Sequence, residues 1–291
     1  MKTMKLIAVI CTSILMSCIV ADNGDNSQIR TPDGYELIWS DEFDQDGRVN
    51  ENYWEYDEGF VRNEELQWYH RDNVYIKDGV LVFEGRREQI ENPNFDPNSR
   101  NWRRNREYAE YTSGLIKTRD RFSFKYGIME VRARIDPRKG SWPAIWTLGI
   151  NRGWPSSGEV DVMEYYRIDG VPSILANAAW DVNNDYNPRW DSEVIPFSYF
   201  LEKDPDWASE FHIWKMDWTE DYIRIYLDDE LLNEIDLNET INYDGFNPFR
   251  QPHYILLNLA IGSNGGDPSE TDFPILYEVD YVRVFQKVEN K

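Results

Sequence analysis

The sequence has 291 residues, 41% of them hydrophobic and 15% aromatic, which is enough to build the core of one large β domain or of two small ones. Its 53 acidic and 31 basic side chains give a formal net charge of -22, which repels phosphate backbones, anionic lipid headgroups and sulfated polymers at long range. The charge argues against nucleic acid as a partner and favours a neutral substrate. The alternative is that the charge only keeps a secreted protein soluble.

The N-terminus has the layout of a secretion signal. Two lysines precede an apolar run over residues 6–16, which is too short to indicate a membrane span. The run ends in the letters LMSC, which resemble a bacterial lipobox in which Cys18 is lipidated and becomes the first mature residue. The alternative is an ordinary cleaved signal. We expect an exported bacterial lipoprotein, held at the cell surface or the periplasmic face of the outer membrane only through its lipid.

Residues 19–33 are polar and contain turn formers, which predicts a flexible tether after the signal of residues 1–18. Cys11 would leave with the signal, so the mature chain would have no pair of cysteines for a disulfide.

Short runs of β type recur from residue 35 onward between turn signals, and no long stretch with a helical period competes with them. In residues 126–135 polar and apolar side chains alternate, so one face of that strand should be buried. There is no internal repeat, and residues 34–288 are predicted to form one all-β sandwich domain. The runs are YELIWS, NVYIKDGVLVFEGR, SGLIKT, YGIMEVRARI, SWPAIWTLGI, EVDVMEYY, FHIWKMDW, YIRIYLDDELL, HYILLNLAI and EVDYVRVF.

Two long segments separate these runs. Residues 89–110 are rich in Asn, Arg and Pro and indicate an ordered excursion or a long loop, and a second loop is expected over residues 180–207. Long loops in compact domains are often functional.

The stretch GEVDVMEYY, residues 158–166, places three carboxylates in an otherwise apolar strand. Glu159 and Asp161 are two residues apart and share a face, whereas strict alternation would put Glu164 on the other face. A one-residue bulge between Asp161 and Glu164 removes the conflict, because the extra residue shifts the alternation. We therefore predict a bulge and three acids on one face.

Three acids on one face repel one another unless a proton or a cation lies between them. In retaining glycoside hydrolysis one carboxylate attacks the anomeric carbon while a second, held protonated, donates to the leaving oxygen, with the pair about 5 to 5.5 Å apart. An acid between them can hold a shared proton and keep their pKa values apart. The alternatives are a metal site and a solvated acidic strand. The apolar residues that flank the three acids favour both alternatives less than a catalytic site.

The stretch GEVDVMEYY also resembles the E-x-D-x-x-E signature of glycoside hydrolase family 16, in its bulged, laminarinase-type branch. The resemblance covers residues 35–285 and implies a β-jelly-roll sandwich of two curved antiparallel sheets with a substrate cleft on the concave face. By position it implies that Glu159 is the nucleophile, Glu164 the acid/base and Asp161 their assistant. Burial should then raise the pKa of Glu164. Further blocks that resemble the family follow in order: NEELQWYHRDNVYIKDGVLVFEGR, YTSGLIKT, YGIMEVRARI, KGSWPAIWTLG, FHIWKMDWTEDYIRIYLDDELL, QPHYILLNLAIG and YEVDYVRVFQ.

Aromatic and amide side chains are candidates for holding a sugar, because an indole ring stacks on the apolar face of a pyranose. Trp142 and Trp146 are four apart on an expected strand and point the same way, although Pro143 weakens that argument. Core packing is the alternative for either ring. By family position Asn63 lies near the cleaved bond, and Glu65 either lines the cleft or makes a buried structural hydrogen bond.

The chain departs from the family pattern in two places. It reads NEELQ where related laminarinases often read NNELQ, and SILANAAWDV where many glucanases have a T-x-H strand. The second departure places Asn177 and Trp180 among the candidate substrate-binding residues. Both departures put a laminarin or mixed-linkage glucan in doubt and leave room for β-galactosidic targets such as poly-N-acetyllactosamine in host glycans.

A transition-metal site is not expected, because no two of the three histidines stand at ligand spacing. The resemblance implies a structural Ca²⁺ on the convex side, held by Glu42, the carbonyl of Gly79 and Asp280. The alternative is that these carboxylates are simply solvated.

The sequence thus favours a monomeric, endo-acting, retaining β-glycanase that needs no cofactor for catalysis. Its substrate is expected to be a neutral glycan, either β-galactosidic (poly-N-acetyllactosamine or O-glycan type) or a β-1,3(4)-glucan. The main alternative is a non-catalytic glycan-binding lipoprotein, which would be expected to lack one of the two glutamates. A calcium-dependent adhesion sandwich is a third possibility and leaves the three acids unexplained.

Overall fold

The computed structural model describes residues 29–288. The expected signal, the lipidation site Cys18 and residues 19–28 of the tether lie outside the described residues. The chain divides into a short unit, Met1–Thr31, and a compact unit, Pro32–Lys291, which contains every strand described here. Within residues 29–288, no helix is long and apolar enough to cross a membrane.

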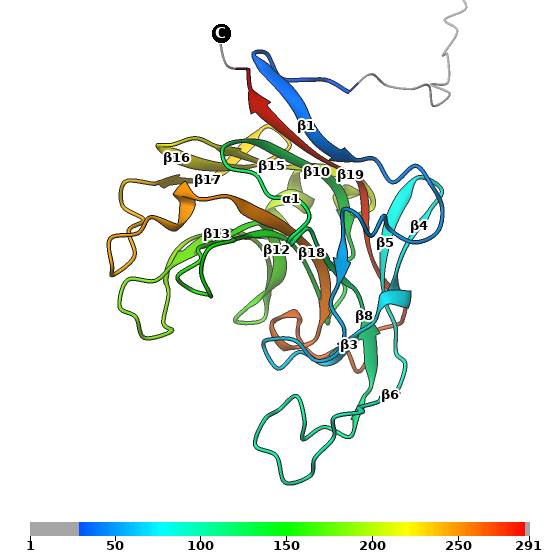
Figure 1. The fold of residues 1–291 in the computed structure, drawn as a ribbon. Coiled ribbons are helices and arrows are strands. Elements are labelled where there is room, and N and C mark those ends of the chain that lie inside the picture. Colours follow the sequence, from blue (N-terminus) through cyan, green and yellow to red (C-terminus); the bar gives the residue numbers. More distant parts are fainter. Residues whose placement is uncertain (1–28, 289–291) are drawn as a thin grey trace, which may run out of the picture. The chain divides into compact units, whose positions relative to one another are not determined.

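Two large antiparallel sheets pack face to face in the compact unit (Figure 1), so the predicted all-β sandwich is confirmed. The first sheet has the order β17-β16-β15-β10-β19-β5-β4, and β1 pairs with β19 beside this path. Its strands are β1 (Tyr35–Asp41), β4 (Val74–Lys77), β5 (Val80–Gly85), β10 (Gly127–Ile135), β15 (His212–Trp218), β16 (Tyr222–Leu227), β17 (Glu230–Asp236) and β19 (Ile275–Lys287).

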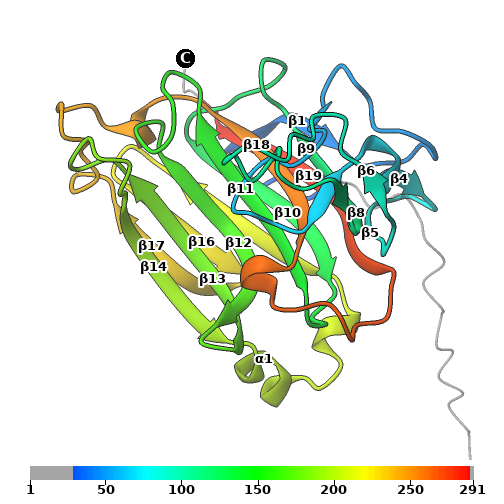
Figure 2. The ribbon, with the colours of Figure 1, turned by 90° about the horizontal axis from the view of Figure 1, so that it is seen from below.

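The second sheet, called the cleft sheet here, has the order β14-β13-β12-β11-β18-β9-β2. Figure 2 shows the long strands β14, β13, β12, β11 and β18 side by side. Its strands are β2 (Glu55–Tyr56), β9 (Leu115–Lys117), β11 (Ser141–Gly149), β12 (Glu159–Ile168), β13 (Val171–Trp180), β14 (Arg189–Pro196) and β18 (His253–Ile261).

Short elements decorate the sandwich. The expected excursion at residues 89–110 is a hairpin of β6 and β7 whose loop extends beyond the sheets (Figure 1). The short elements are β3 (Gln67–Tyr69), β6 (Ile90–Glu91), β7 (Tyr108–Ala109), β8 (Tyr111–Ser113), the helix α1 (Ser198–Lys203) and the 3₁₀ turns η1 (Arg71–Asn73), η2 (Trp207–Ser209), η3 (Pro248–Arg250) and η4 (Ser263–Gly265).

The burial pattern explains why the two sheets differ. Along β10 buried and partly exposed residues alternate, as predicted, so its apolar side chains face the core and its charged side chains face out. Along β18 all nine residues are buried, because one face packs in the core and the other lies under a cavity and its loops. Polar side chains on that second face of the cleft sheet are therefore enclosed rather than solvated.

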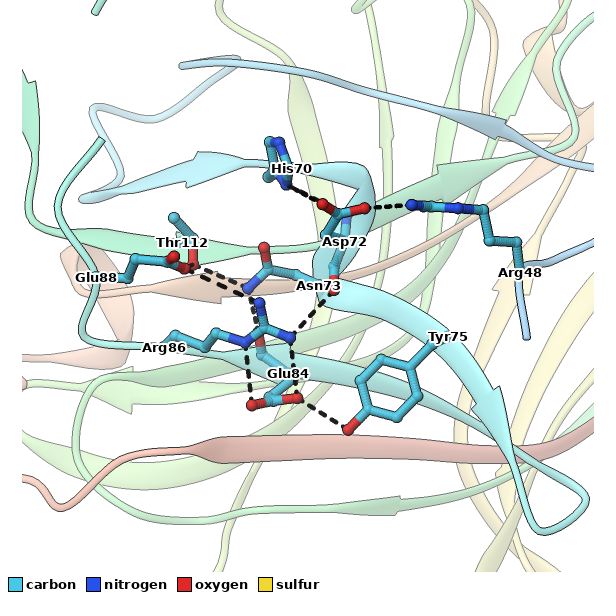
Figure 3. Close-up of polar contacts among 9 residues, drawn as sticks. All are labelled: Arg48, His70, Asp72, Asn73, Tyr75, Glu84, Arg86, Glu88 and Thr112. Carbon is cyan, nitrogen blue, oxygen red and sulfur yellow. Dashed lines mark hydrogen bonds and ion pairs between the residues drawn. The ribbon is translucent and has the colours of Figure 1, made fainter. Parts of the chain in front are cut away.

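A polar network fixes the turn that follows β3 (Figure 3). Asn73 in η1 donates from Nδ2 to Thr112 Oγ1 at 2.9 Å, which ties this turn to β8. In β5 Glu84 accepts from Arg86 Nε at 3.0 Å and from the Tyr75 hydroxyl at 2.9 Å. Since β3 pairs in parallel with β8, the network also holds the segment just before β3, which lines the cavity described next.

Candidate active site

The acidic strand β12 contains the predicted bulge. Against β13, Asp161 pairs with Asn177 and Glu164 with Leu175, so three steps along β12 match two steps along β13. The register of β12 against β11 shifts at the same place. As a result Glu159, Asp161 and Glu164 all line one cavity of about 740 Å³.

The cavity lies on the face of the cleft sheet that points away from the core. It is lined by side chains of β11, β12, β14 and β18, of the loop before β12, of residues 61–65 and of η4. The volume is within the range of about 300–1,000 Å³ that is usual for ligand pockets. Besides the three acids it is lined by Val61, Arg62, Asn63, Glu65, Trp142, Ala144, Trp146, Leu148, Trp154, Tyr166, Trp190, Asn258, Ser263 and Asn264.

Two donors hold Glu164 in place. The indole Nε1 of Trp142 donates to Glu164 Oε1 at 2.9 Å, and Asn177 Nδ2 donates to Glu164 Oε2 at 3.4 Å. Asn177 Nδ2 also lies 3.3 Å from Asp161 Oδ2, so one amide bridges both acids. The orientation of Glu164 is thus set by a tryptophan of β11 and an asparagine of β13.

Burial raises the pKa of each acid, to about 8 for Glu159, to about 7 for Glu164 and well above the usual value for Asp161. The charge of Glu164 raises the pKa of Glu159 further, whereas the Arg62 cation and the donor side chain of Trp154 lower it. The three carboxyl groups therefore share protons near neutral pH. Such a set can present an ionised nucleophile and a protonated donor at the same time.

Both expected tryptophans of β11 line the cavity. Trp146 donates from Nε1 to Asn258 Oδ1 at 2.8 Å, and the Arg62 guanidinium lies 4.7 Å from its ring centroid. The Trp142 ring meets Tyr166 edge-on, with the centroids 5.3 Å apart. Pro143 does not disturb the alternation, since β11 keeps its pairing with β18 from Ser141 to Gly149.

The segment with Asn63 and Glu65 lines the same cavity as the three acids. Asn63 Nδ2 donates to Glu65 Oε1 at 3.3 Å, and Gln67 Nε2 donates to Glu65 Oε2 at 2.6 Å. Only 2% of Glu65 is exposed, and burial raises the pKa of its carboxyl group. Asn63 and Glu64 have φ values of 54° and 52°, the left-handed region that few residues adopt. Glu65 therefore takes part in buried hydrogen bonds and lines the cavity at once.

The family model for glycosyl hydrolases family 16 matches residues 63–283. The chain belongs to glycoside hydrolase family 16. It is 32% identical to a β-glucanase from Rhodothermus marinus, over 95% of this chain and 93% of that protein. It is 29% identical to a keratan-sulfate endo-1,4-β-galactosidase from Sphingobacterium multivorum, over 87% of this chain and 55% of that protein. It spans only 38% of the glucan endo-1,3-β-glucosidase A1 of Niallia circulans, so some relatives are much longer.

A solved structure supports the same family assignment. It is described as an endo-acting O-glycanase that members of the human gut microbiota express to initiate mucin breakdown. It superposes with a TM-score of 0.79 at 32% identity, over 88% of this chain and 92% of that chain. The family and the jelly-roll sandwich expected from the acidic signature are confirmed.

Two expectations about this family 16 site need correction. Trp180 does not line the cavity: 3% of it is exposed, and it packs in the main core, where its ring meets Phe249 with centroids 6.4 Å apart. Asn177 and Trp180 are three residues apart on β13, so alternation puts them on opposite faces. Asn177 itself lies beneath the acids, in contact with Asp161 and Glu164, and is not part of the cavity lining.

Several residues that line the cavity are not among those predicted from the sequence. Trp154 precedes the acidic signature by five positions, and its position so close to the acids was a usable signal. Trp190 lies on the edge strand β14, and Asn258 is a polar residue between two leucines in β18. Arg62 stands directly before Asn63, but its contact with Trp146 links segments far apart in the chain.

The residues expected to hold Ca²⁺ do not fit such a site as arranged. Glu42 accepts from Arg283 Nη2 at 2.6 Å, and Asp280 accepts from Arg132 Nη1 at 2.5 Å. Each carboxylate is thus already neutralised by a guanidinium, and Gly79 lies in the turn between β4 and β5. In the part of the chain that the structure describes, no group of three His, Cys, Asp or Glu side chains could hold a metal ion.

Proposed function

We propose that this protein is an endo-acting, retaining β-glycanase that cleaves internal bonds of a neutral glycan by double displacement. One observation carries the proposal: Glu159 and Glu164 line the same open cavity, with Asp161 between them on the bulged strand. A non-catalytic glycan-binding protein would have no use for two partly buried glutamates held at the cost of mutual repulsion.

In the first step, a Glu159 oxygen attacks the anomeric carbon while Glu164 donates its proton to the departing glycosidic oxygen. The carbon–oxygen bond of the substrate breaks, and an ester bond to Glu159 forms. In the second step Glu164 takes a proton from water, whose oxygen attacks the same carbon and releases Glu159. Two inversions leave the product with the configuration of the substrate.

The neighbours of the acids have assigned roles in this proposal. Asp161, whose pKa is raised by burial and by both glutamates, holds a proton close to them. Asn177 bridges Asp161 and Glu164 and keeps the acid/base oriented. Trp142 donates to Glu164 and stabilises the ionised form that appears after the first proton transfer.

The substrate class is proposed from the lining and from the relatives. Tryptophan rings with nearby amides suit sugar rings, which present apolar faces and a rim of hydroxyl groups. The relatives act on different glycans, since one is a β-glucanase, one a keratan-sulfate endo-β-galactosidase and one an O-glycanase. We therefore propose β-galactosidic chains of the O-glycan or poly-N-acetyllactosamine type and β-1,3(4)-glucans as the two substrate candidates.

The experiment is a digest of laminarin, barley β-glucan, agarose and mucin-type O-glycans, followed by analysis of product size over time. An endo-acting enzyme gives a spread of intermediate oligosaccharides, and proton NMR of the first product should show the β anomer if configuration is retained. The matched control is Glu159→Gln. Absence of cleavage on every glycan, or an α-anomeric first product, contradicts the proposal.

We also propose that the protein is exported as a lipoprotein anchored through Cys18, on the sequence pattern alone. Labelling with a fatty-acid analogue in a bacterial host should tag the wild-type chain and not Cys18→Ala. Equal labelling of the two chains contradicts the anchor and leaves the glycanase proposal untouched.

A further inference from the structure

A second cavity, of about 340 Å³, adjoins the candidate active site. Trp154 lines both cavities, so the two hollows share one wall. The second cavity is formed by three loops, residues 150–158, 181–188 and 237–252, which follow β11, β13 and β17. It therefore adjoins the cleft at Trp154, and none of the three acids lines it.

Aromatic side chains surround this second cavity. Tyr186 exposes 80% of its surface, Tyr243 50% and Trp154 41%. A ring that is this exposed gains little from folding, so burial in the core does not account for its presence here. Nearby, Trp190 on the edge strand lines the main cavity and is 44% exposed. An aromatic surface thus continues from the active site outward.

Buried polar contacts fix the three loops relative to one another. Asp181, which is 3% exposed, accepts from the Ser156 hydroxyl at 2.5 Å and from the Asn184 backbone N–H at 2.8 Å. Asn242, which is 2% exposed, accepts from the Asp181 N–H at 3.1 Å and donates to the Ser156 carbonyl at 2.8 Å. The Tyr243 N–H donates to the Asp181 carbonyl at 2.8 Å. The loops that carry the aromatic rings are therefore held in a fixed arrangement by these hydrogen bonds.

We propose that this cavity is a distal subsite that binds a sugar ring of the same glycan chain, away from the cleaved bond, between Tyr186 and Tyr243. The proposal rests on the proposed glycanase function and extends it. Exposed tyrosine rings match the apolar face of a pyranose, and the surrounding amide and hydroxyl groups match its hydroxyls. A phosphorylated or sulfated ligand is disfavoured, because Asp181 lines this cavity and the chain carries a net charge of -22. Among the described residues, the one cation in the lining, Arg152, is already paired with Asp244.

The test compares substrates of different length. Wild type and the double variant Tyr186→Ala/Tyr243→Ala are assayed on laminari-oligosaccharides and on poly-N-acetyllactosamine oligosaccharides of two to eight sugars. We expect the double variant to lose about tenfold in kcat/KM on the longest cleaved oligosaccharide, with the loss disappearing as the chain is shortened. Tyr108→Ala removes a ring that is 41% exposed and lines neither cavity, and should leave the length dependence unchanged.

A loss that is equal at all lengths, or no loss at all, overturns the distal subsite while the glycanase function stands. If wild type cleaves none of these chains, binding decides the subsite, and the proposed function is judged separately by the digest of the four glycans described above. The longest oligosaccharides are then titrated calorimetrically into wild type and the double variant. Weaker binding by the double variant supports the subsite, and equal or undetectable binding by both overturns it.

Discussion

Trp142 and Glu164 are joined by a hydrogen bond in which the indole Nε1–H donates to Oε1 at 2.9 Å. Burial raises the pKa of Glu164 to about 7, and this hydrogen bond opposes the rise. An acid/base catalyst works best with a pKa near the working pH, because it must both give and take a proton. The hydrogen bond from the indole of β11 therefore brings the pKa of the β12 carboxyl group closer to the value that its proposed acid/base role requires.

The variant Trp142→Phe tests this relationship, since it keeps a ring and removes the donor. The hydrogen bond lowers the pKa of Glu164, so its loss should raise that pKa further. Because Glu164 must be protonated to start the reaction, the alkaline limb of the kcat/KM profile should move to higher pH. The pH profiles of wild type and variant are compared, and an unmoved alkaline limb contradicts the assignment.

The two glutamates should respond differently to the leaving group. We expect Glu164→Gln to reduce turnover of the natural glycan by about 10²–10⁴-fold, the usual contribution of general acid catalysis. An aryl glycoside with an acidic phenol needs no protonation, so Glu164→Gln should still form the glycosyl–enzyme with it. Glu159→Gln lacks the nucleophile and should be inactive on both substrates. Burst kinetics on the aryl glycoside separate these roles, and equal behaviour of the two variants would contradict them.

The bulge in β12 could be predicted from the sequence because charge and alternation conflict there. Three acids in an apolar strand must share one face, and only an extra residue allows Glu164 to join Glu159 and Asp161. The same alternation rule, applied to Asn177 and Trp180, would have placed Trp180 in the core. That error came from assigning both residues to one cleft by family position.

Contacts between distant segments of the site could not be predicted from the local sequence. Arg106 lies 42 positions from Glu64 and donates from Nη2 to its carbonyl at 2.9 Å, a contact that depends on how the hairpin of β6 and β7 packs. Tyr186 and Tyr243 meet at the second cavity from loops after different strands. Periodicity predicts which face a residue occupies, whereas contacts between loops follow from the tertiary fold.

Arg106 is predicted to hold the segment that carries Asn63 and Glu65. Its guanidinium donates to the backbone carbonyls of Glu64 and Glu65, at 2.9 Å and 2.5 Å. Arg106→Ala should free this segment and raise KM on the order of tenfold, with a smaller effect on kcat. The matched control is Arg104→Ala, whose guanidinium donates to Asn94 within the same hairpin. Steady-state kinetics check this prediction, and equal KM values for the two variants contradict it.

Substitutions of Trp180 and Trp154 should have different effects, the first on stability and the second on substrate binding. Trp180→Ala removes a core ring and should lower the free energy of unfolding by about 3–5 kcal/mol, while the folded fraction keeps its KM. Trp154→Ala removes a ring that is 41% exposed and lines both cavities, so KM should rise with little change in Tm. Denaturant unfolding and kinetics on the same samples provide the measurement. A rise in KM for Trp180→Ala would restore that residue to the binding site.

The pH dependence of stability should reveal the buried acids directly. In the folded chain the pKa of Glu159 lies at about 8, above its usual value of 4.5. The folded state therefore favours the protonated form, so the contribution of this group is fully present below pH 4.5 and is lost as the pH rises through 8. The side chain of the Glu159→Gln variant cannot ionise, so the variant does not lose this stability as the pH rises. The variant should be more stable than wild type at pH 8, by a few kcal/mol in order of magnitude, and close to it at pH 4.5.

Thermal unfolding of wild type and Glu159→Gln between pH 4.5 and pH 9 measures this difference. Glu193→Gln is the control, because it makes the same chemical change at an exposed position on β14. Its Tm difference from wild type should stay nearly constant over that range, since an exposed carboxylate remains hydrated in both states. A Glu159→Gln difference that is flat with pH, or that shrinks as the pH rises, would mean that burial does not hold a proton on this acid. The shared-proton arrangement of Glu159, Asp161 and Glu164 would then be wrong.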